Sequence, residues 1–153
     1  NLKHFRMTGG EPMMDKNTYK VFQYIIDNPK KDLHLNITSN MCPADKKIKA
    51  KYFNMAQEIC MQEKVEHLMQ FVSVDAFGKR AEYIRDGLDF NYMMDNVEEF
   101  LDRIPVRNSI TFICTYNKKN FYAFFNEHDR RRLTRFLNTF PEMEEFWKEC
   151  MNA

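Results

Sequence analysis

The segment RMTGGEP, residues 6–12, places a carboxylate in a turn close to the start of the chain. Two consecutive glycines give the backbone access to left-handed conformations, and Pro12 fixes φ directly after the acid. Such a turn can present backbone carbonyls and the charge of Glu11 to an ammonium group of a ligand. An ordinary turn with a solvated acid explains the same residues equally well, because short motifs often occur by chance.

Polar residues also follow three later apolar segments of the chain. In parallel α/β sheets and barrels, ligands bind at the carboxyl ends of the strands, so these residues predict one shared polar pocket. Loops are usually polar, which is the simpler explanation for any single residue. It is weaker for residues inside an apolar strand, where an amide or hydroxyl needs a partner. The residues are Asn36, Thr38 and Asn40, then Ser73 and Asp75, then Thr115 and Asn117.

The elements that would position these residues alternate between strands and amphipathic helices. Apolar patterning predicts strands over residues 2–7, 33–38, 67–74 and 109–115. It predicts helices over residues 15–28, 46–62 and 89–103 between them. This alternation is typical of an α/β fold with a parallel sheet and right-handed crossovers.

The pattern changes after residue 117. Residues 118–120 form a short polar joint, and the rest of the chain favours helices. Thr139 and Glu142 have the spacing of a capping box before a last helix over residues 141–151. We therefore divide the chain into an α/β part, residues 1–117, and a helical C-terminal segment, residues 118–153.

Composition excludes several function classes. The net charge of +1 gives no general reason to expect nucleic acid as a partner. The four cysteines and four histidines have no metal-ligand spacing, so we predict no metal ligand in this chain. No apolar run approaches the ~20 residues of a membrane span. Scattered cysteines without a signal peptide favour a cytoplasmic protein, and the start at Asn1 is expected to be a cut end.

Three segments together resemble radical S-adenosylmethionine (SAM) enzymes. RMTGGEPMM, residues 6–14, resembles the GGEP motif of that family. LNITSN, residues 35–40, is similar to the next family strand, and VSVDAFGKRAEYIRDGLDF, residues 72–90, to the segment after it. The three occur in family order and at family spacing. The tail FFNEHDRRRLTRFLNTFPEMEEFW, residues 124–147, is similar to that of the twitch-domain subgroup.

The resemblance implies a partial, TIM-like (β/α)6 barrel that holds SAM across its strand ends. Gly10 and Glu11 would contact the methionine ammonium group, and Arg85 would bind the methionine carboxylate. Ser73 and Asp75 would lie near the ribose. The expected cofactor-binding residues are Gly9, Gly10, Glu11, Asn36, Thr38, Asn40, Ser73, Asp75 and Arg85. For Arg85 the competing interpretation is an ordinary surface arginine on a short helix.

The resemblance also implies a [4Fe-4S] cluster that cleaves SAM to a 5′-deoxyadenosyl radical, which abstracts hydrogen from a substrate such as a peptide or other macromolecule. The family's cluster ligands form a C-x3-C-x2-C motif, which this sequence lacks. We therefore expect a longer protein to supply the cluster ligands and two further strand–helix units. The chain alone would then be catalytically inert, and it contains no predicted catalytic residue.

Other functions remain open at this level. A degenerate barrel could bind SAM or a partner protein without catalysis. The arginines of residues 130–136 could bind phosphates, but the following glutamates favour a solvated helix with ion pairs, so nucleic acid is not expected. The pair His128-Asp129 is only weakly indicative of a metal-dependent phosphohydrolase. Oligomeric state is not predicted.

Overall fold

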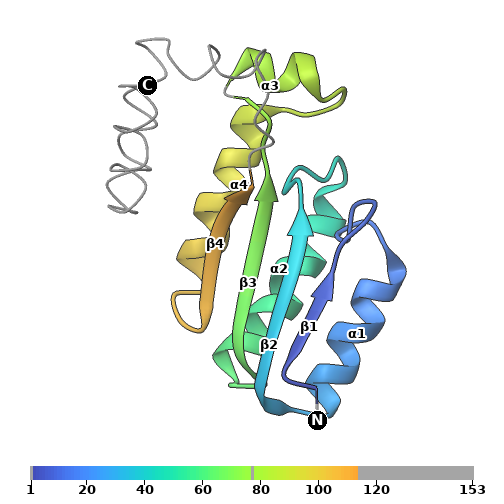
Figure 1. Ribbon diagram of the computed structural model, residues 1–153, viewed down its shortest axis with the longest axis vertical. Coiled ribbons are helices and arrows are strands. Elements are labelled where there is room, and N and C mark those ends of the chain that lie inside the picture. The colour runs from blue at the N-terminus through green and yellow to red at the C-terminus, as the bar shows by residue number, and fades with distance from the viewer. Residues whose placement is uncertain (1, 77, 114–153) are drawn as a thin grey trace.

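A computed structural model describes residues 2–76 and 78–113 of the 153-residue chain (Figure 1). The strands are β1 (His4–Met7), β2 (Lys30–Ser39), β3 (Val65–Ser73) and β4 (Asn108–Ile113). The helices are α1 (Lys16–Asp27), α2 (Lys46–Met61), α3 (Lys79–Ile84) and α4 (Phe90–Arg103). The predicted helical segment 118–153, with its capping box, arginine run and His-Asp pair, lies outside the described residues, as do Thr115 and Asn117.

The strands form one four-stranded sheet in the order β1-β2-β3-β4, and every pair is parallel. In this register Arg6 lies opposite Asn36, which lies opposite Met69 on the next strand. The predicted α/β fold with a parallel sheet is therefore confirmed. Because all strands run in the same direction, their carboxyl ends meet at one edge of the sheet.

One face of the sheet is covered by helices. On β2, Leu33, Leu35 and Ile37 alternate with half-buried residues and are themselves buried. Figure 1 shows α1, α2 and α4 behind the sheet on this face. The other side we call the open face. From the histidines to the carboxyl edge, its strand side chains are His4, Arg6, His34, Asn36, Thr38, His67, Met69, Phe71, Ser73, Ser109, Thr111 and Ile113.

The core between sheet and helices is rich in aromatic side chains. Phe53 and Phe100 pack edge to face, with ring centroids 5.1 Å apart, and both flank Tyr52. The buried Tyr52 hydroxyl donates a hydrogen bond of 2.6 Å to Gln70 Oε1. Gln70 Nε2 in turn donates to the carbonyl of Ile37 over 3.1 Å. Tyr52 and Gln70 are thus paired, as burial requires.

Aspartates begin three of the helices. Asp15, Asp45 and Asp89 each accept a hydrogen bond from a backbone N–H of the first turn of α1, α2 and α4, which satisfies one of the free donors there. The predicted helices at these places are confirmed. No helix among the described residues is long and apolar enough to cross a membrane.

Two elements differ from the sequence prediction. β2 begins at Lys30 rather than Leu33, because its polar first residues pair with the sheet without contributing apolar side chains to the core. Residues 79–84, which lie outside the helices predicted from apolar periodicity, form α3. Ala81 is the buried residue of this short helix, so the sequence has no apolar periodicity that would predict the helix.

Candidate functional site

The GGEP turn follows β1 at the carboxyl edge of the sheet. Gly9 and Gly10 have φ angles of 93° and 59°, the left-handed region that glycine adopts without strain. A Cβ atom on either glycine would meet nothing within 4 Å. Backbone conformation, rather than crowding by protein atoms, therefore requires glycine here, and the space beside both residues is open to a ligand.

Glu11 ties this turn to the end of β2. Its Oε1 accepts hydrogen bonds from Ser39 Oγ at 2.5 Å and from the backbone N–H of Met13 at 3.1 Å. Its Oε2 accepts from the backbone N–H of Asn40 at 2.8 Å. A carboxylate offers about four acceptor positions, so three are used within the described part of the chain and one on Oε2 is left for a ligand.

The residues after β2 are held by their own side chains. Ser39 Oγ accepts from the N–H of Met41 and Asn40 Oδ1 from the N–H of Cys42, each over 2.9 Å. Met41 has a positive φ of 53°, and its carbonyl accepts from the buried Asn96 of α4 at 2.8 Å. This loop is consequently fixed from both the sheet side and the helix side.

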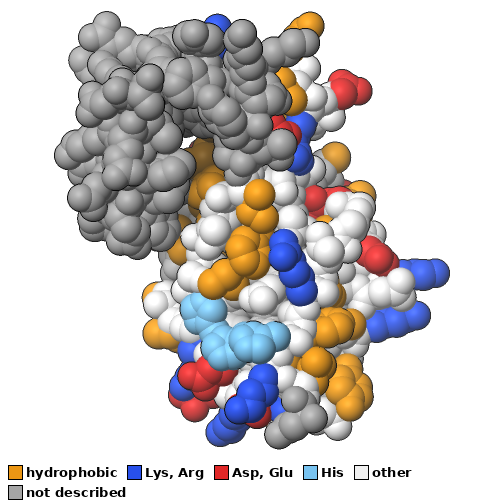
Figure 2. All heavy atoms as spheres, in the orientation of Figure 1, with side chains coloured by type: hydrophobic (Ala, Val, Ile, Leu, Met, Phe, Trp, Pro, Cys, Tyr) orange, Lys and Arg blue, Asp and Glu red, His pale blue; other side chains and the backbone are white. Residues whose placement is uncertain are grey.

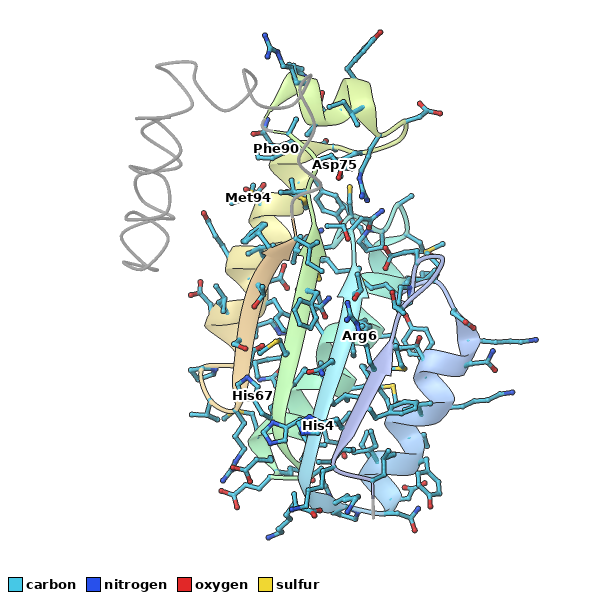
Figure 3. The ribbon with its side chains drawn as sticks, viewed as in Figure 1. His4, Arg6, His67, Asp75, Phe90 and Met94 are labelled. Atoms are coloured by element: carbon cyan, nitrogen blue, oxygen red, sulfur yellow. The ribbon has the colours of Figure 1, made fainter. Side chains whose placement is uncertain are left out.

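An ion pair lies after β3. Arg85 Nε donates to Asp75 Oδ2 over 2.6 Å, and the two side chains are 34% and 15% exposed. Figure 3 shows Asp75 beyond the carboxyl end of β3, with α3 further out. Among the described residues the terminal guanidinium nitrogens of Arg85 have no partner, so they can still donate to an anion.

These segments line a partly open cavity of about 300 Å³ at the carboxyl edge. Its lining contains one acid, one base and otherwise glycines, hydroxyls and an amide, which suits a zwitterionic ligand better than an apolar one. The volume is at the lower end of the range for small-molecule sites. The lining residues are Thr8, Gly9, Gly10, Glu11, Thr38, Ser39, Asn40, Ser73 and Arg85.

Most of the expected cofactor-binding residues meet in this cavity. Two of them do not line it. Asp75 contacts the site only through Arg85, and Asn36 lies two residues before Thr38 on the open face. Sequence reasoning missed Thr8 and Ser39. Ser39 could have been found from its place in LNITSN directly before Asn40, whereas its bond to Glu11 depends on the register of β1 and β2.

Two tyrosines, Tyr19 of α1 and Tyr52 of α2, lie on the helix side of the sheet and are affected by the charge of Glu11. The Tyr19 hydroxyl donates to the carbonyl of Met13 and holds the end of the GGEP turn on α1. Burial and then the charge of Glu11 raise the pKa of Tyr19 above its ordinary value. The same two causes, in the same order, raise the pKa of Tyr52 well above its ordinary value. Both hydroxyls therefore remain protonated donors at neutral pH.

The described residues contain no group of three or more His, Cys, Asp or Glu side chains that could hold a metal ion. Cys42 is half-buried and Cys60 is buried, and both are free thiols. Burial raises the pKa of Cys60 to about 12, so it is a protonated core residue rather than a thiolate ligand. The described residues do not fit a [4Fe-4S] cluster.

The chain was compared with protein-family models, with curated proteins and with solved structures, and no significant match was found in any of the three. The fold and the polar cavity thus define a class, an α/β protein with a candidate small-molecule site at the carboxyl ends of parallel strands.

Proposed function

We propose that this chain is the SAM-binding part of a radical SAM enzyme. The observation that carries the proposal is that the three family-like segments, far apart in sequence, converge on one polar cavity. Glu11 comes from the first, Asn40 from the second and Arg85 from the third. A parallel sheet brings any strand ends to one edge, so the support lies in the residue types that meet there: an acid, an amide and a base.

The cavity suits the amino-acid end of SAM. Glu11 follows β1 and Arg85 follows β3 and α3; β1 and β3 lie on either side of β2, so the two strands are about 10 Å apart. The ammonium and carboxylate groups of an amino acid are bonded to the same carbon atom. Both groups would therefore bind at once, between the acid Glu11 and the base Arg85. The free acceptor position of Glu11 Oε2 would take the ammonium group, and the terminal nitrogens of Arg85 would take the carboxylate.

The remaining lining can take the ribose and the sulfonium side of the ligand. Ser73 and Thr38 offer hydroxyls at the ends of β3 and β2, and Gly9 and Gly10 allow close approach to the backbone. Asp75 would position Arg85 rather than touch SAM, which revises its expected place near the ribose. SAM itself supplies the sulfonium, and the chain's residues bind and orient it.

The strand order supports a partial (β/α)6 barrel as the whole architecture. Consecutive strands are neighbours and the helices α1, α2 and α4 lie on one face, whereas a doubly wound sheet reverses its strand order and has helices on both faces. The open face would then be the inner wall of the barrel. We further propose that the cluster ligands belong to residues outside this chain and that the substrate is a peptide or another macromolecule.

Saturation-transfer difference NMR with SAM tests the proposal, because it detects weak as well as tight binding. We expect saturation of SAM protons by the wild-type chain and by Glu98→Gln, which removes an exposed carboxylate of α4. Glu11→Gln should lose most of the signal. No transfer to SAM in the wild type, or equal transfer in both variants, would contradict the proposal.

A further inference from the structure

Between its histidines and the carboxyl edge, the open face of the sheet has one permanent charge among its strand side chains, that of Arg6. The other strand residues in this part of the face are polar or apolar and neutral. Lys30 and Asp32 share the alternation of His34, but they lie at the amino end of β2 and pair with each other over 2.7 Å. Figure 2 shows the face with the pale-blue histidines together and a single basic side chain among white and orange groups above them.

The Arg6 side chain is held across the sheet rather than extended into solvent. Its Nη2 donates a hydrogen bond of 3.4 Å to Thr38 Oγ1 on β2. Its guanidinium carbon lies 5.0 Å from the centroid of the Phe71 ring on β3, within the range of a cation–π interaction. Figure 3 shows the Arg6 side chain lying over the middle of the open face.

This placement puts the guanidinium directly beside the candidate SAM cavity. Thr38, the hydrogen-bond partner of Arg6, is itself a lining residue of that cavity. Arg6 forms no ion pair with an acid of the described residues, although it is exposed and has donors to spare. A guanidinium in a fixed orientation, without a counter-ion and next to a cofactor cavity, is suited to bind a carboxylate or a phosphate with two hydrogen bonds.

We propose that Arg6 binds an anionic group of the substrate, a carboxylate or a phosphate, on the open face beside the SAM cavity. This inference rests on the proposed function, because the bound anion is placed next to SAM. Asn36, opposite Arg6 in the register, lies on the same face and offers an amide donor for the same anion. The contact with the Phe71 ring holds the guanidinium against the sheet.

The test uses inorganic phosphate and acetate as separate probes, with chloride at matched ionic strength as the reference. Each probe is titrated into the 15N-labelled chain while amide chemical shifts are followed. The variants are Arg6→Gln and Arg80→Gln, the latter removing an exposed arginine of α3. We expect the probes to shift the amides of residues 36, 38 and 71 in the wild type and in Arg80→Gln. In Arg6→Gln, the affinity for phosphate and acetate should fall roughly tenfold, because one charge-assisted hydrogen bond to the anion is lost.

The two probes distinguish the anions, since a preference for phosphate indicates a phosphorylated substrate and a preference for acetate a carboxylate. Equal binding of the probes by Arg6→Gln and the wild type would overturn the inference. So would a loss of SAM binding in Arg6→Gln, because Arg6 would then belong to the cofactor site. Failure of the proposed function has a different result: phosphate or acetate binds at Arg6, but the wild type does not bind SAM.

Discussion

Replacing Glu11 with alanine should destabilise the protein, because this carboxylate joins the GGEP turn to the end of β2. The substitution leaves three donors without their acceptor: Ser39 Oγ and the backbone N–H groups of Met13 and Asn40. Met13 is fully buried and Ser39 is 2% exposed, so water cannot easily replace the acceptor at these two. Asn40 is half-buried and can turn to solvent more readily.

A buried donor that loses its partner costs about 1–3 kcal/mol. Two such donors, with a smaller contribution from Asn40, give an expected loss of about 3 kcal/mol in the free energy of unfolding. With an m-value of about 2 kcal/mol/M for a domain of this size, the urea midpoint should fall by about 1.5 M.

Urea unfolding followed by circular dichroism measures this change. Glu98→Ala on the exposed side of α4 removes the same charge and should leave the midpoint nearly unchanged. Glu11→Gln, which keeps one acceptor oxygen, should fall between the wild type and Glu11→Ala. If Glu11→Ala unfolds within about 0.5 kcal/mol of the wild type, the carboxylate does not hold the turn and the reasoning is wrong.

Three further predictions follow from buried groups of the fold. Tyr52→Phe leaves Gln70 Oε1 without its donor in the core and should lower the free energy of unfolding by about 1–3 kcal/mol, measured by urea titration; no change would mean that Gln70 finds another donor. Burial, with a smaller effect of a neighbouring histidine, lowers the pKa of His67 below 6.5. The unfolded chain therefore binds more protons than the folded one between these two pKa values, and stability should fall as pH decreases below 6.5. His67→Gln should reduce this slope in urea titrations at pH 5–7, and an unchanged slope would exclude His67 as its source. Because the pKa of Cys60 is raised to about 12, peptide mapping after iodoacetamide treatment at pH 8 should find the half-buried Cys42 alkylated before Cys60; the reverse order would contradict the burial of Cys60.

The sequence was sufficient to predict the alternation of elements and where three helices begin. Apolar residues on strands and on one side of each helix have periods that are visible without a structure. Asp15 and Asp89 stand directly before such patterns, so the first residues of α1 and α4 could be predicted. A short helix with one buried residue, such as α3, has no comparable signal.

The candidate site was predictable only in part. Residues at strand ends could be named, because parallel strands bring their carboxyl ends to one edge. Contacts between strands could not, since they depend on register. The bond between Glu11 and Ser39 and the reach of Arg6 over β2 to Phe71 both require neighbouring strands to be aligned as they are. The proposed anion site depends on the second of these contacts.

Mapping SAM onto the chain by NMR tests the central proposal most directly. SAM is titrated into the 15N-labelled protein and the shift of each backbone amide is recorded. The account predicts that the largest shifts fall on residues 8–11, 38–40, 73 and 85, which line the cavity at the carboxyl edge. Shifts that are absent, or that fall on α4 or the amino ends of the strands instead, would contradict it.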